Sequence, residues 1–136
     1  MSSVRITPDG DFLVPAESER LEYKTAVPSV RETVQILSGF AEGNGGVLIV
    51  GISDGGRIVG ISDQAAVEAA KRFREVVGGL LFEGEWRISV ERLGAGRTIA
   101  FAEIRRGDED EEMITDVLLT TRSRQIRTQE RLVESH

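Results

Sequence analysis

The sequence has no cysteine, and its single histidine is the terminal His136. Disulfides, thiolate nucleophiles and Cys/His zinc sites are therefore excluded, as is a catalytic triad built around a histidine. Acid or base chemistry on this chain has to come from Asp, Glu, Lys or Tyr, or from metal-bound water. The absences point toward carboxylate-based, metal-assisted chemistry if the protein is an enzyme.

Long hydrophobic runs are also missing. No apolar stretch approaches the roughly 20 residues that cross a bilayer, and the opening MSSVRITPDG lacks the basic-then-apolar layout of a signal peptide. No low-complexity linker or internal repeat divides the 136 residues. We therefore expect one soluble, cytoplasmic domain with a single core.

The charge is acidic and unevenly spread. A formal net charge of -6 argues against non-specific nucleic-acid binding driven by bulk charge. However, the run DEDEE at 108–112 is followed by Arg122, Arg124, Arg127 and Arg131. Alternate spacing places Arg122 and Arg124 on one face of a strand, where they could contact phosphates. The competing interpretation is a solvated face that balances the acidic loop.

Hydrophobic periodicity and turn residues predict the secondary structure. The expected elements are a strand within 19–25, a helix to about 42, strands at 47–52 and 57–61 paired as a hairpin, a second helix to 77, and strands at 86–90, 98–104 and 114–119. The first helix is expected to open with a capping box of Ser29 and Glu32, and the second to be capped by Asp63. The core stripes are expected to be Val30, Val34, Leu37 and Phe40 on the first helix, and Val67, Ala70, Phe73 and Val77 on the second. Trp86 is expected in the core or at a dimer contact. This order predicts an α/β (α+β) fold, a mixed sheet with two main helices.

Three segments resemble a known family in order and spacing. ESERLEYK at 17–24 resembles the "ES…LEFK" opening of the Schlafen/AlbA-type domain, GFAEGNGG at 39–46 its "AFANT-GG" segment, and VLIVGISDGGRIVG at 47–60 its "LLIGVDD-G-IVG" hairpin. The family's Asn-Thr is replaced here, and Ser53 stands for its first aspartate. The resemblance implies a Schlafen/AlbA-like domain over 17–130, between an irregular segment at 1–16 and a tail at 131–136.

The resemblance also implies a function. Schlafen-type nucleases cut structured RNA, tRNA in particular, with a divalent metal held by two glutamates and an aspartate. By motif these acids are Glu17, Glu22 and Asp54, with Mg²⁺ or Mn²⁺ as the metal for an all-oxygen ligand set. Lys24 would steady a phosphate as a catalytic and nucleic-acid-binding residue, together with Arg122, Arg124 and Arg127. A single lobe would need a homodimer to form the RNA groove of longer relatives.

Spacing alone leaves simpler interpretations open. Glu17 and Glu22 converge only if the chain bends between them, because an odd separation puts them on opposite faces of a strand. Otherwise Glu22 simply pairs with Lys24, and Asp54 is a turn residue. The segment GNGG at 43–46 lacks the ending of a P-loop, which favours a helix cap over a phosphate cradle. The alternative function is a non-catalytic DNA- or RNA-binding regulatory module, and a protein-interaction domain is a third.

Overall fold

The computed structural model describes residues 17–93 and 96–106, together with two short strands ahead of them. These two, β1 (Arg5–Ile6) and β2 (Phe12–Leu13), form an antiparallel pair. They lie within the segment expected to be irregular.

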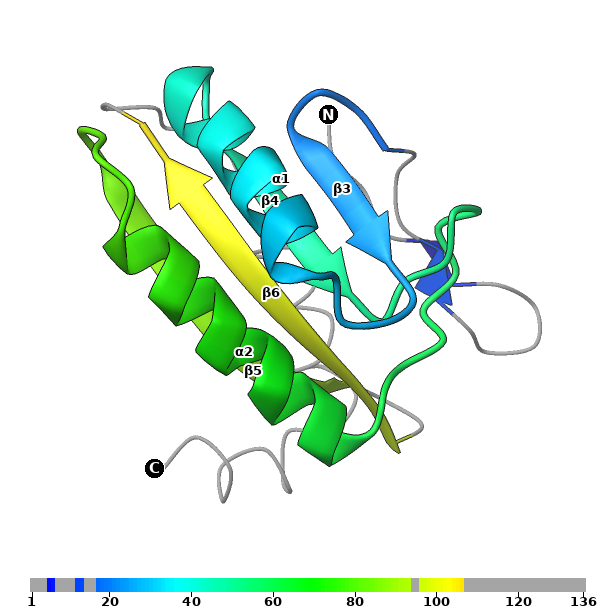
Figure 1. Ribbon diagram of the computed structural model, residues 1–136. Coiled ribbons are helices and arrows are strands. Elements are labelled where there is room, and N and C mark those ends of the chain that lie inside the picture. The colour runs from blue at the N-terminus through cyan, green and yellow to red at the C-terminus, as the bar shows by residue number, and fades with distance from the viewer. Residues whose placement is uncertain (1–4, 7–11, 14–16, 94–95, 107–136) are drawn as a thin grey trace.

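A four-stranded mixed sheet and two helices form the body of the domain. In chain order the elements are β3 (Leu21–Lys24), α1 (Val30–Glu42), β4 (Gly46–Val50), α2 (Asp63–Gly78), β5 (Glu85–Leu93) and β6 (Arg97–Arg105). The sheet order is β3-β4-β6-β5. β3 runs parallel to β4, while β6 is antiparallel to both of its neighbours. Figure 1 shows both helices on the same face of this sheet, which confirms the predicted fold class.

Both helices begin at serine caps. Ser29 accepts from the backbone of Glu32 while the Glu32 side chain reaches back to Ser29, the predicted capping box. The second helix differs from expectation, because its cap is Ser62, whose Oγ accepts from the backbone N–H of Ala65 at 3.1 Å. Asp63 instead accepts hydrogen bonds from Arg92 and Thr98, which ties the start of α2 to the sheet.

The helix-facing core differs in part from the predicted stripes. Val30, Val34 and Val67 were expected to face the core, but their exposed fractions are 55%, 41% and 62%. Their places are taken by Thr33 on α1 and by alanines on α2. The buried residues on this side of the sheet are Leu37, Phe40, Ala41, Leu48, Val50, Ala66, Ala69, Phe73, Val76, Val77, Ala100, Ala102 and Ile104. Periodicity located the helices correctly and misjudged their rotation by about one position.

A second apolar cluster lies on the other face of the sheet. Its members are Leu21, Tyr23, Val47, Ile49, Ile52, Ile58, Leu93, Ile99 and Phe101. The expected hairpin is reduced to one isolated bridge, Ile52 with Ile58, while Ile61 bridges to Thr98 on β6 instead. Gly51 (φ 116°) and Gly60 (φ 77°) interrupt the ladder, because neither adopts an extended strand conformation.

Trp86 is 52% exposed, so it is not a core residue. Within the described part of the chain, no helix is long and apolar enough to cross a membrane. The predicted strand at 114–119 lies outside the described residues.

Candidate functional site

The alternation of β3 divides its side chains between two environments. Leu21 and Tyr23 are buried in the second apolar cluster. Glu22 and Lys24 pair in register with Leu48 and Val50, which belong to the helix-facing core. β3 is also the terminal strand of the described sheet, next to α1. This strand therefore presents the acidic side chain of Glu22 and the basic side chain of Lys24 at the edge of the sheet, beside the N-terminal half of α1.

A tight turn brings Glu17 to the same edge. The backbones of Ser18 and Leu21 exchange hydrogen bonds of 3.0 and 3.2 Å, which reverses the chain just before the strand. The Glu17 carboxylate then accepts from the backbone N–H of Tyr23 at 3.0 Å. The bend that the Glu17–Glu22 spacing requires is therefore present, and Glu17 also satisfies a backbone donor on the outer side of β3.

The carboxyl groups of Glu17 and Glu22 interact directly. The pKa of Glu22 lies above its ordinary value, first because the side chain is partly buried. A hydrogen bond with the Glu17 carboxyl and the charge of Glu17 raise it further, while Lys24 lowers it and the charge of Asp54 raises it. Two carboxyl groups in contact with each other favour a shared proton or a bound cation over two negative charges. Burial and the nearby Glu17 charge also raise the pKa of the Tyr23 hydroxyl.

Asp54 stands on the turn after β4. The turn is closed by a 2.9 Å hydrogen bond from the Gly56 N–H to the Ser53 carbonyl, so Asp54 is a turn residue as well as a neighbour of the acid pair. Its side chain is exposed, and its charge reaches Glu22. Over residues 17–93 and 96–106, no three acidic side chains form a group that could hold a metal as they stand. The structure thus brings Glu17 and Glu22 together and leaves Asp54 nearby.

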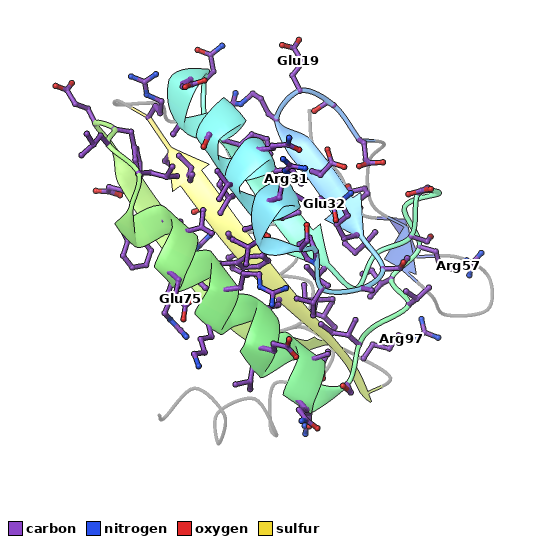
Figure 2. The ribbon with its side chains drawn as sticks, in the orientation of Figure 1. Glu19, Arg31, Glu32, Arg57, Glu75 and Arg97 are labelled. Carbon is purple, nitrogen blue, oxygen red and sulfur yellow. The ribbon has the colours of Figure 1, made fainter. Side chains whose placement is uncertain are left out.

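Lys24 is shared between two acids. Its Nζ lies 3.2 Å from Glu32 Oε2 and 4.0 Å from Glu22 Oε2. The predicted pairing of Lys24 with Glu22 is therefore present, but the shorter contact is to Glu32 on α1, the residue labelled in Figure 2. The hydrogen bond from Lys24, followed by that from the Ser29 backbone, lowers the pKa of Glu32. The sequence identifies Glu32 only as a capping residue. Its position as the third residue of α1 does not indicate the ion pair with Lys24.

The two pKa shifts predict opposite effects of charge removal. Glu22 has a raised folded-state pKa, so its contribution to stability is present in acid and is lost as the pH rises through that value. Glu32 has a lowered pKa, so its contribution is present at neutral pH and is lost in acid. At pH 7 we expect Glu22→Gln to raise Tm by roughly 2 °C, a figure reduced for solvent screening, and Glu32→Gln to lower it.

Thermal unfolding between pH 3 and pH 8 measures both effects, and each should shrink toward the acid end. A Glu22→Gln variant that is less stable than the wild type at pH 7 would contradict the inferred repulsion between the two carboxyls. Glu32→Gln serves as the matched control, because it removes the same group from the other side of Lys24.

The glycine-rich segment at 43–46 ends α1, and two of its N–H groups bond to carbonyls of the helix. The N–H of Gly43 donates to the Gly39 carbonyl and that of Gly45 donates to the Phe40 carbonyl, both at 2.9 Å. A Cβ at Gly46 would lie 2.5 Å from the Phe40 ring, so this position requires close backbone packing. The helix-cap interpretation of 43–46 therefore agrees with the geometry. Arg122, Arg124 and Arg127 lie outside the described residues.

Comparison with known proteins supports the resemblance read from the motifs. A family model described as Schlafen, AlbA_2 matches residues 17–125, which is most of the chain. A search of curated proteins found no match. The family match supports a nucleic-acid-related function, and it begins at Glu17, the first residue of the acid pair.

Proposed function

Since the chain belongs to the Schlafen, AlbA_2 family, we propose that it is a metal-dependent endoribonuclease acting on structured RNA such as tRNA. The observation that carries the proposal is the Glu17–Glu22 carboxyl pair at the edge of β3, with the charge of Asp54 close enough to affect it. A structural role alone would not require two carboxyls to face each other, because their repulsion costs stability at neutral pH.

The donors suit a hard divalent cation. Glu17, Glu22 and Asp54 offer only carboxylate oxygens, the ligand type of Mg²⁺ and Mn²⁺. The first two already share a hydrogen bond whose proton a cation would replace, whereas Asp54 would have to move toward them to become a third ligand. When bound, such an ion supplies charge neutralisation and Lewis acidity at a phosphate.

The remaining residues of the proposal bind and orient the RNA. Lys24 contacts both Glu32 and Glu22, and we assign to its ammonium group the stabilisation of charge on the phosphate. We assign further phosphate contacts to Arg122, Arg124 and Arg127, whose guanidinium groups suit bidentate binding. A homodimer would supply the second lobe of the RNA-binding surface. A monomer in light scattering at assay concentration would oppose this assignment.

Cleavage of purified tRNA with and without Mg²⁺ or Mn²⁺ tests the activity. We expect metal-dependent cutting that falls by at least about 100-fold in Glu22→Gln, since the metal supplies several kcal/mol of transition-state stabilisation. Glu75→Gln is the matched control, because Glu75 is exposed on α2, away from β3 (Figure 2). Equal cutting by the wild type and Glu22→Gln would remove Glu22 from the site.

A second readout separates metal binding from catalysis. In the absence of RNA, Mn²⁺ should raise Tm of the wild type and leave that of Glu22→Gln unchanged, since a ligand that binds only the folded state stabilises it. If no metal supports cutting, but RNA binds with a steep salt dependence, the protein is a binding module and the nuclease proposal fails.

A further inference from the structure

A pocket of about 290 Å³ lies beside the turn that follows Glu17 and precedes β3. It is lined by Ser18, Glu19, Arg20, Gly39, Gly43, Asn44 and Gly45. One wall is therefore the turn that brings Glu17 to Glu22, and the other is the C-terminal end of α1. Most of these residues are exposed, so the pocket opens to solvent. Its size is at the lower end of ligand sites and suits a small ring system.

The pocket and the acids lie close together along the chain. Arg20 belongs to the turn that precedes β3, two residues before Glu22. It lines the pocket together with residues at the end of α1. Two residues of chain span at most about 7 Å, comparable to one step between nucleotides in an extended strand.

Gly39 keeps the pocket open without any packing reason to be a glycine. It is in the interior of α1, where glycine costs roughly 0.5–1 kcal/mol relative to alanine. A Cβ built there meets no atom within 4 Å, and its φ is not positive. Neither crowding nor backbone conformation therefore demands glycine at this position. A side chain would point into open space that the pocket includes.

The lining fits the edge of a nucleobase better than a phosphate. Arg20 offers donors, Glu19 offers acceptors, and Asn44 offers both. Figure 2 shows Glu19 on the turn that precedes β3. A phosphate would lie beside the negatively charged Glu19 carboxylate, whereas the partial negative charge of the helix end is offset by Arg106, which donates to the carbonyls of Glu42 and Gly43. Unpaired bases in RNA are recognised through such mixed donor and acceptor contacts and by stacking on arginine.

We infer that this pocket binds one unpaired base of the RNA, adjacent to the phosphate that is cut, and so selects the cleavage position. The inference rests on the proposed function for its substrate class. It adds a specificity site, with Arg20 and Asn44 as the base-contacting residues, that is distinct from the acids.

Binding of labelled homopolymeric ribo-oligonucleotides of A, C, G and U, measured by fluorescence polarisation in Ca²⁺, tests the pocket separately from cleavage. We expect the wild type to prefer one base by about tenfold, the size of one good base-edge contact. Gly39→Met, which fills the pocket, should reduce this preference to about twofold or less, and so should Arg20→Met. Gly78→Met is the control, since Gly78 on α2 also has open space around its Cβ.

The outcomes distinguish the two proposals. A base preference that survives in Gly39→Met, with Tm showing a folded variant, overturns the pocket while leaving the nuclease proposal intact. A preference lost only in the pocket variants supports it, even if no metal gives cleavage. Equal binding of all four homopolymers by the wild type, or no binding of any, also overturns it.

Discussion

Replacing Gly45 by alanine is expected to lower the free energy of unfolding by about 3 kcal/mol or more. Gly45 has φ of 83°, a conformation that L-residues rarely adopt, and a Cβ there would lie 2.4 Å from the carbonyl oxygen of Ile104. That oxygen belongs to the buried strand β6, so it cannot swing aside as a flexible side chain would. Urea denaturation followed by circular dichroism should show a lower midpoint with an unchanged slope.

Gly39→Ala is the internal control for this prediction. Gly39 is six residues earlier in the same glycine-rich segment, yet the same substitution there meets no neighbouring atom. It should raise the free energy of unfolding by about 0.5–1 kcal/mol, because alanine is the better helix former. A Gly45→Ala protein as stable as the wild type would show that the backbone does not approach β6 as closely as described.

The two substitutions have opposite expected effects on the free energy of unfolding, because the two glycines have different roles. Gly45 allows β4 to start directly against β6, whereas Gly39 leaves space beside the turn that carries Glu17. The sequence could predict that the segment GNGG at 43–46 ends the helix, because the pattern of a helix stop is local. It could not distinguish the packing glycine from the pocket glycine, since the difference depends on Ile104, about 60 residues further along the chain.

The secondary structure was predictable where the pattern was long and local. The capping box at Ser29 and the apolar run of β4 gave the helix start and a buried strand correctly. Val34 and Val67 were wrongly placed in the core, because several rotations of a helix satisfy a short apolar stripe and only the neighbouring elements decide between them. The prediction of a strand at 57–61 was wrong for a different reason, because Gly51 and Gly60 adopt non-extended conformations.

The candidate site was predictable only through the family motifs. Spacing alone put Glu17 and Glu22 on opposite faces of a strand, and the Ser18–Leu21 turn that reverses the chain has no strong sequence signal. The sequence identifies Asp54 both as a turn residue and as an acid of the family motif. In the structure it lies on the turn after β4, where its charge reaches Glu22. Whether the three acids bind a metal together stays a prediction. The partnership of Lys24 with Glu32 depends on how α1 packs beside β3, which no local pattern encodes.

The sequence does not predict an ion cluster of Glu103, Arg87 and Arg105 on the face of the sheet away from the helices. Glu103 on β6 has a side chain only 3% exposed and accepts hydrogen bonds of 3.2 Å from both Arg87 and Arg105. Arg87 also lies over the Phe101 ring, 5.6 Å from its centroid. In the run TIAFAEIR the glutamate looks like a solvent-facing residue of an alternating strand. Its burial depends on what covers that face, not on the strand itself.

Glu103→Ala is therefore expected to lower the free energy of unfolding by about 2 kcal/mol, because the variant loses two hydrogen bonds between charged groups while both arginine side chains, 40% and 29% exposed, keep access to solvent. Adding Arg87→Met should recover part of the loss, because it removes one of the two guanidinium groups that the Glu103 carboxylate contacts, and a double-mutant cycle measured by urea denaturation gives the coupling. Glu75→Ala, at an exposed position on α2, is the control and should change stability by less than about 0.5 kcal/mol. Additive effects of Glu103→Ala and Arg87→Met would mean that the cluster contributes nothing as a unit.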